Sequence, residues 1–140
     1  MSTALDALRL LALEALRGQT IEHKKSGLQR CLAQLARAQT WPASSSLDTP
    51  EPQNLPGRPA RPQLQAHRDI PSASLYTREG LPRLLHSVAH IEFNAINLAL
   101  DAVWRFKAMP LAFYADWLQI AMEEATHFSL LENLLSELGY

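Results

Sequence analysis

The chain has few of the residues that mark disulfide-bonded, membrane or nucleic-acid-binding proteins. Its single cysteine, Cys31, excludes an internal disulfide and suits a reducing compartment, and its helical surroundings indicate a buried, inert thiol. No apolar run reaches the roughly 18 residues that a membrane-spanning helix needs. The 13 basic and 14 acidic residues nearly cancel, so no charge footprint for nucleic acid or a membrane surface is present. We therefore expect a cytoplasmic protein that binds neither.

Proline is scarce outside one stretch of the chain. Residues 41–80 contain seven of the nine prolines: Pro42, Pro50, Pro52, Pro56, Pro59, Pro62 and Pro71. Because proline lacks a backbone donor and fixes φ, neither a helix nor a central strand is expected there. Segment 41–80 is either a linker or a segment that wraps along the surface of the protein, and the sequence leaves both alternatives open.

Helical periodicity dominates the N-terminal part of the chain. A first helix is predicted over residues 3–17, where Thr3 and Asp6 have the spacing of a capping box. A second helix is predicted over residues 21–38, weakened by Gly27 near its middle. Together they predict an N-terminal helical hairpin over residues 1–40.

Helical periodicity returns in the C-terminal part. One helix is predicted from residue 81 to 106 and another from 111 to 138, with Gly139 as its terminator. No strand pattern competes, so the predicted fold class is all-α. Residues 81–140 are expected to form an antiparallel helix pair.

Two glutamates lie where a buried face is expected. With 3.6 residues per turn, Glu92 is the one charged residue in the middle of an apolar stripe, and Glu124 occupies the same place on the next helix. His127 lies one turn after Glu124 on the same face, whereas Glu123 lies on the flank. Both glutamates are equidistant from the turn expected at 107–110, so they should face each other at the same height.

This arrangement of side chains predicts a metal site. A carboxylate in an apolar seam is costly unless it is paired, protonated or bound to a metal, and Glu92, Glu124 and His127 have the residue types that suit iron or manganese. A glutamate opposite a Glu-x-x-His motif is half the ligand set of a carboxylate-bridged di-iron or di-manganese bundle. The structural alternative is a Glu–His hydrogen-bond network without metal.

Other aromatic and histidine residues have weaker patterns. His86 and His90 are four residues apart but fall on the polar side of their helix, which favours solvent-facing or supporting roles. Trp104 and Trp117 are interpreted as packing residues. Tyr114 lies nearer the inner face, where a role beside the metal is an open alternative.

The segments HSVAHIEFNAINLALDAVWRF and FYADWLQIAMEEATHFSLLENLLSELGY resemble a ferritin-like family known as domain of unknown function 455. The GRPARP segment and the N-terminal helices resemble it as well. The resemblance implies a ferritin-like four-helix bundle in which Glu92, Glu124 and His127 are metal ligands. It also implies two further bundle helices, which would carry the rest of the site and which this chain lacks.

Two functions follow as expectations. The first is a di-metal (di-iron or manganese) ferritin-like protein, an oxidase or oxygenase of unknown substrate, with half of its site in this chain. The second is a non-catalytic helical interaction module or an inactive truncated fragment. Either the chain is truncated or two copies form a homodimer that completes the bundle. A lone hairpin of residues 81–140 would expose its apolar stripes, so a monomer is expected to be unstable or prone to aggregation.

Overall fold

The computed structural model describes residues 2–49, 55–59 and 80–140, and no strand occurs in these ranges. The all-α class predicted from the periodicity is therefore confirmed. Each predicted helix boundary lies within one residue of the observed one. The four helices are α1 (Ala4–Arg17), α2 (Ile21–Arg37), α3 (Gly80–Arg105) and α4 (Leu111–Glu137).

Side chains and a glycine close the helix ends as the sequence predicts. The backbone N–H of Asp6 donates to Thr3 Oγ1 at 3.1 Å, and the backbone N–H of Thr3 donates to Asp6 Oδ2 at 3.0 Å, which completes the capping box of α1. At the far end of the chain, Gly139 has a φ of 84° and its N–H donates to the Ser136 carbonyl at 3.0 Å. This left-handed conformation ends α4, because residues with a Cβ rarely adopt it.

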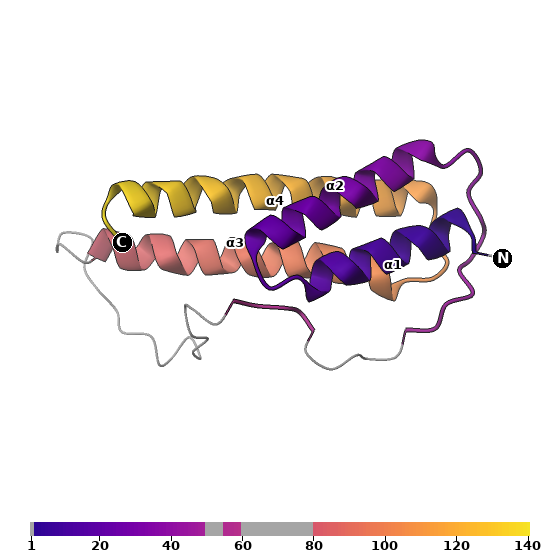
Figure 1. The fold of residues 1–140 in the computed structure, drawn as a ribbon, viewed down its shortest axis with the longest axis horizontal. Coiled ribbons are helices and arrows are strands. Elements are labelled where there is room, and N and C mark those ends of the chain that lie inside the picture. Colours follow the sequence, from indigo (N-terminus) through magenta and orange to yellow (C-terminus); the bar gives the residue numbers. More distant parts are fainter. Residues whose placement is uncertain (1, 50–54, 60–79) are drawn as a thin grey trace.

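The two hairpins pack on each other to form the core. Figure 1 shows α3 and α4 as a long antiparallel pair, with α1 and α2 lying along the half that includes the α3–α4 turn. In that half α1 contacts α3 and α2 contacts α4. The largest fully buried apolar side chains come from all four helices and include Leu5, Leu8, Leu16, Leu28, Ile96, Leu100, Leu118 and Val103. The N-terminal hairpin therefore covers about half of the long hairpin. The sequence predicted exposed apolar stripes for a lone hairpin of residues 81–140 and did not predict this covering.

Gly27 allows the close approach of α1 and α2. A Cβ at this position would overlap the side chain of Ala15 on α1 and lie 2.9 Å from the Ala15 Cα. The sequence indicated only that Gly27 weakens its helix. The structure shows that the same glycine permits tight packing between the two helices.

We expect Gly27→Val to destabilise the protein by about 1–3 kcal/mol, because the added atoms force α1 and α2 apart. Urea unfolding followed by circular dichroism measures the change. In the double variant with Ala15→Gly, part of that loss should return, since residues in contact are energetically coupled. Equal losses in the single and double variants would contradict this account of the contact.

The described part of the proline-rich segment lies along the protein surface. It bonds to the α3–α4 turn at two places and to α1 at one: Trp41 Nε1 donates to the Met109 carbonyl at 3.2 Å, Ser45 N donates to the Lys107 carbonyl at 2.7 Å, and Gly57 N donates to the Leu16 carbonyl at 2.8 Å. Residues 41–49 and 55–59 therefore lie against α1 and the α3–α4 turn. The rest of the predicted segment, residues 50–54 and 60–79, lies outside the described residues.

A buried polar network fastens this segment to α1 and α3. The Arg9 guanidinium is fully buried and donates to the Trp104 carbonyl at 2.8 Å and to Ser45 Oγ at 2.7 Å. Ser45 Oγ in turn donates to the Asp6 carboxylate. The hydrogen bond from Ser45, followed by that from the Thr3 backbone, lowers the pKa of Asp6 from 3.8 to about 2. The network keeps a cation and an anion inside the fold with their polar atoms largely partnered.

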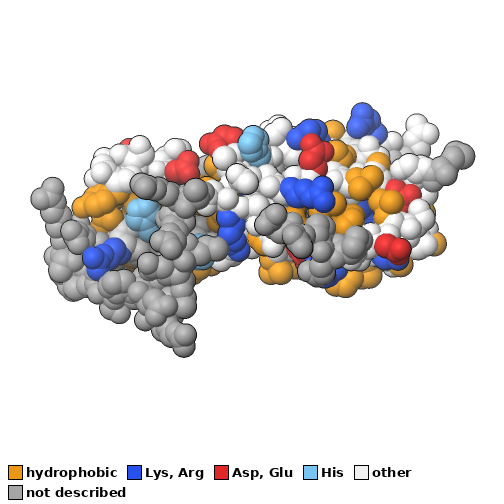
Figure 2. Space-filling model, turned by 60° about the horizontal axis from the view of Figure 1, so that its bottom comes forward, with side chains coloured by type: hydrophobic (Ala, Val, Ile, Leu, Met, Phe, Trp, Pro, Cys, Tyr) orange, Lys and Arg blue, Asp and Glu red, His pale blue; other side chains and the backbone are white. Residues whose placement is uncertain are grey.

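Within the described residues, no helix is long and apolar enough to cross a membrane. Basic and acidic side chains are interspersed over the described part of the face in Figure 2. That mixture agrees with the formal net charge of −1.

Candidate metal centre

Glu92 on α3 and Glu124 on α4 lie opposite each other near the middle of the long hairpin. The Nδ1 atom of His127 lies 3.7 Å from Glu92 Oε2 and 3.5 Å from Glu124 Oε2. One ligand atom from each of the three residues lies within 4.8 Å of the other two. The equal sequence distances to the turn predicted this common height, and the structure brings all three side chains together.

The cluster is partly open to solvent. The side chains of Glu92 and Glu124 are 19% and 24% exposed, and that of His127 is 54% exposed. The sequence predicted a dry seam, and this detail was wrong. The N-terminal hairpin reaches Phe93 through Lys24 and Ser129 through Lys25, but it leaves the three ligand side chains partly open to solvent. An ion held here would keep positions open to water or to another ligand.

One carboxylate oxygen of the cluster is buried without a hydrogen-bond partner. Oε2 of Glu92 is shielded from solvent and accepts no hydrogen bond in the described structure. Such an orphaned oxygen costs stability, since it loses water without gaining a donor. His127 Nδ1 lies 3.7 Å from it, beyond hydrogen-bond reach.

The spacing of the three ligand atoms fits a single metal ion. Transition-metal ions bind carboxylate oxygen and imidazole nitrogen at about 2.1 Å, so two ligands at angles of 90–120° lie about 3.0–3.6 Å apart. His127 Nδ1 lies 3.5 Å and 3.7 Å from the two carboxylate oxygens, and all three ligand atoms lie within 4.8 Å of one another, so the side chains must draw slightly closer to bind one ion. No lysine or arginine of the described residues forms an ion pair with either glutamate. The residues present therefore fit an iron or manganese ion.

The residues to which the sequence gave weaker roles lie elsewhere. Nε2 of His90 is 3.1 Å from Nδ2 of Asn94, one turn along α3 and away from Glu92. The hydroxyl of Tyr114 donates to the Phe106 carbonyl at 2.8 Å and accepts from Met109 N at 3.3 Å. Tyr114 thus closes the α3–α4 turn, and the alternative that placed it beside the metal was wrong.

The buried face of α4 is rotated from the predicted one. Its best-buried residues are Tyr114, Leu118, Ala121 and Ala125. Ile120, which shares the helical stripe of Glu124, is exposed. The difference arises because α4 packs against α2 as well as α3, which shifts the buried arc toward α2. Glu124 consequently lies at the edge of the buried arc rather than at its centre.

A hollow of about 370 Å³ lies between the half of α3 before Glu92 and the half of α4 after His127, and none of the three ligand residues lines it. Phe93 and Phe128 line it, next in sequence to Glu92 and His127, and their ring centres are 5.4 Å apart. His86 and His90 lie at the same hollow. A volume of this size admits a small organic molecule.

Lys24 is a buried cation that the sequence analysis did not identify. Its side chain is fully buried, its Nζ donates to the Leu16 carbonyl at 3.0 Å, and it lies 5.3 Å from the centre of the Phe93 ring. Burial, reinforced by the charge of Arg58, lowers the pKa of Lys24 from 10.5 to about 7. A sequence signal existed, because Lys24 shares a helical stripe with Ile21, Leu28 and Cys31.

Comparisons with known proteins agree with the resemblance seen in the sequence. A model of the family described as "Protein of unknown function (DUF455)" matches residues 18–140. A curated protein of Haemophilus influenzae with the name "Uncharacterized protein" is 50% identical over 94 residues, which make up 62% of this chain and 33% of that relative. The chain therefore spans about a third of the relative's length. No solved structure matches.

Proposed function

The chain belongs to the DUF455 family, and from this membership and the geometry of the cluster we propose that it supplies half of a di-metal carboxylate centre in a ferritin-like protein. The observation that carries the proposal is the convergence of Glu92, Glu124 and His127 within 4.8 Å, with a buried carboxylate oxygen that lacks a partner. Two glutamates and a Glu-x-x-His histidine are half of the ligand set that such bundles use.

Each of the three side chains has a separate role in this proposal. Glu92 and Glu124 would hold the ion and balance its charge, because carboxylates suit hard cations. His127 would add an imidazole nitrogen, Nδ1, which lies within 3.7 Å of both carboxylates. Iron or manganese bound here would supply redox chemistry with dioxygen, and the hollow beside Phe93 and Phe128 would receive an organic substrate. The resulting activity is that of an oxidase or oxygenase, which we place in the cytoplasm.

The remaining ligands of a two-metal centre must come from outside these two helices. A second copy of the chain is one source, and in longer relatives a further part of the polypeptide is the other. The uncovered half of the long hairpin carries exposed apolar side chains suited to such contact, with Ile91 and Leu130 each 62% exposed. The same exposed side chains favour the second candidate function, a non-catalytic helical interaction module.

Anaerobic addition of Fe(II) followed by air tests the proposed function. We expect oxygen consumption and a near-ultraviolet absorption band from oxidised, carboxylate-bound iron, whereas Zn(II), which has no redox chemistry, should give neither. The oligomeric mass is measured in the same samples. A protein that remains metal-free and consumes no oxygen, yet forms a defined dimer, would instead support the interaction module.

We expect Glu92→Gln to stabilise the metal-free protein by about 0.5–1.5 kcal/mol, because it removes a negative charge that faces Glu124 without a donor. Urea unfolding in the presence of a chelator measures the change. Glu123→Gln, on the exposed flank of α4, is the matched control and should change stability little. Should Glu92→Gln lower stability instead, the metal-free Glu–His hydrogen-bond network would be the better account.

A further inference from the structure

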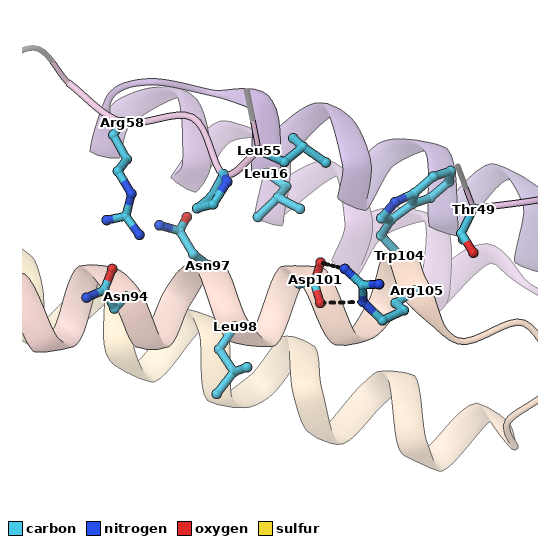
Figure 3. Close-up of a pocket in the computed structure, with 11 residues that line it drawn as sticks. Leu16, Thr49, Leu55, Arg58, Asn94, Asn97, Leu98, Asp101, Trp104 and Arg105 are labelled. Atoms are coloured by element: carbon cyan, nitrogen blue, oxygen red, sulfur yellow. Dashed lines mark hydrogen bonds and ion pairs between the residues drawn. The ribbon is translucent and has the colours of Figure 1, made fainter. Parts of the chain in front are cut away.

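A second cavity lies on the opposite side of α3 from the metal ligands. It has a volume of about 380 Å³ and is enclosed by α3, the end of α1 and residues 55–58 of the surface segment. Figure 3 shows its polar side chains, with Asn94 and Asn97 rising from α3 and Arg58 descending from the segment above them. Its apolar wall includes Leu16, Leu55 and Trp104.

Asn97 is the residue that indicates a ligand. Its side chain is only 4% exposed, yet neither Nδ2 nor Oδ1 has a hydrogen-bond partner in the described structure. Oδ1 of Asn94, one turn away, is also buried without a partner. Buried amides in proteins are almost always hydrogen-bonded, because an amide that is buried without a partner loses its hydrogen bonds to water and gains none in return. Two neighbouring carboxamides therefore present both donors and acceptors to this cavity.

Arg58 gives a positive charge to the end of the cavity that Asn94 and Asn97 line. The guanidinium of Arg58 points toward Asn97 in Figure 3, and no acidic residue of the described chain forms an ion pair with it. Arg58 also lies close enough to Lys24 to lower the pKa of that lysine. Asp101, the acid that lines the cavity, is already held by Arg105 at 2.9 Å. An anion would therefore meet an uncompensated cation beside two unsatisfied amides.

Backbone packing fixes the position of Arg58. At the preceding residue, Gly57, a Cβ would overlap the carbonyl of Arg17 at the end of α1. The N–H of Gly57 donates to the Leu16 carbonyl at 2.8 Å. This close contact fixes the backbone next to Arg58, whose guanidinium points toward Asn97 in Figure 3.

We infer that this cavity binds a small organic anion, a carboxylate or a phosphate ester. Its oxyanion lies between Arg58 and Asn97, an adjacent hydroxyl donates to a carboxamide oxygen, and its apolar part lies along Leu16 and Trp104. Guanidinium groups bind both kinds of oxyanion through paired N–H donors, and neutral amides add donors without adding charge. The volume fits a molecule with one ring. This site does not depend on the metal centre.

Mandelate and phenyl phosphate are suitable probes, because each carries a ring and an oxyanion. Mandelate adds a hydroxyl donor, and mandelamide is the neutral control. Isothermal titration of the full chain should show binding of at least one anion with a Kd below about 1 mM and at least about tenfold weaker binding of mandelamide. Binding of mandelate alone would identify a carboxylate site, and binding of phenyl phosphate alone a phosphate site. Failure of both anions to bind would overturn the inference.

Two variants then locate the bound anion. Arg58→Gln should weaken anion binding at least about tenfold and leave mandelamide unaffected, whereas Arg37→Gln, which removes an exposed arginine of α2, should change neither. Asn97→Leu should abolish binding and raise the urea midpoint, since it removes two orphaned polar atoms. Anion affinity that is unchanged in Arg58→Gln, or in Asn97→Leu with its fold intact, would place the anion elsewhere and contradict the inference.

Discussion

A Glu124→Ala variant is expected to bind Fe(II) or Mn(II) at least about 100-fold more weakly than the native chain, a loss of roughly 2.7 kcal/mol. The substitution removes one of three ligands and leaves Glu92 and His127, whose Oε2 and Nδ1 atoms are 3.7 Å apart. Two ligands hold a hard divalent ion poorly because water competes for the vacated position. Anaerobic competition with a metal-binding dye measures the affinity.

Glu123→Ala is a closely matched control for this experiment. It removes the same charge from the adjacent position of α4, but Glu123 is exposed and its carboxylate accepts a hydrogen bond from Gln119 Nε2 at 3.3 Å. Metal affinity in Glu123→Ala should stay within about twofold of the native value, since exposed single charges act weakly at a distance. Equal losses in the two variants would mean that the acids attract ions only through their general charge.

Replacing Lys24 with methionine is expected to stabilise the protein by about 3 kcal/mol at pH 6, because a buried ammonium without a carboxylate partner is replaced by an apolar chain of similar length. The hydrogen bond that is lost, from Lys24 Nζ to the Leu16 carbonyl, does not leave an orphaned acceptor. That carbonyl also accepts from Gly57 N at 2.8 Å. Urea unfolding at pH 6 measures the gain.

The pH dependence gives this prediction a definite sign. The pKa of Lys24 is about 7 in the folded chain against 10.5 for the ordinary side chain. Between these values the unfolded chain holds a proton that the folded chain lacks, so stability rises with pH by up to about 1.4 kcal/mol per unit. Below pH 7 both states are protonated and the full cost of the buried charge remains.

The native chain should therefore gain stability between about pH 7 and 8.5 relative to Lys24→Met, and the advantage of the variant should shrink over that range. Staying below pH 9 avoids the thiol of Cys31, whose pKa burial raises from 9.0 to about 12. Lys25→Met, at the next residue, is the control and should show no such pH dependence. An advantage of Lys24→Met that is constant with pH would show that Lys24 is not the titrating group.

The local features of the fold could be predicted because they depend on near neighbours in sequence. The 3.6-residue period places Glu92 and Glu124 on facing stripes, and equal distances to the turn at 107–110 place them at one height. The cap at Thr3 and the terminator at Gly139 follow from residue chemistry at single positions. For these features the sequence pattern and the three-dimensional contacts coincide.

The features that the sequence did not reveal depend on contacts between distant segments. The packing of α2 on α4 rotates the buried arc of α4 and leaves Glu124 at its edge. Asn97 is buried because α3 also has a face toward α1, which the stripe centred on Glu92 does not describe. The contact of Gly57 with the end of α1 joins residues far apart in the chain. A helical period gives the direction of each side chain but not the number of neighbours that cover the helix.

Substoichiometric Mn(II) added to isotope-labelled protein tests the central claim most directly, because this paramagnetic ion broadens the NMR signals of nearby nuclei. We predict that the amide signals of Glu92, Glu124 and His127 disappear first, that those of α1 around Thr3 persist, and that Glu124→Ala abolishes the effect. Broadening that begins elsewhere on the surface, or that survives in Glu124→Ala, would contradict the assignment of a metal ion to these three side chains.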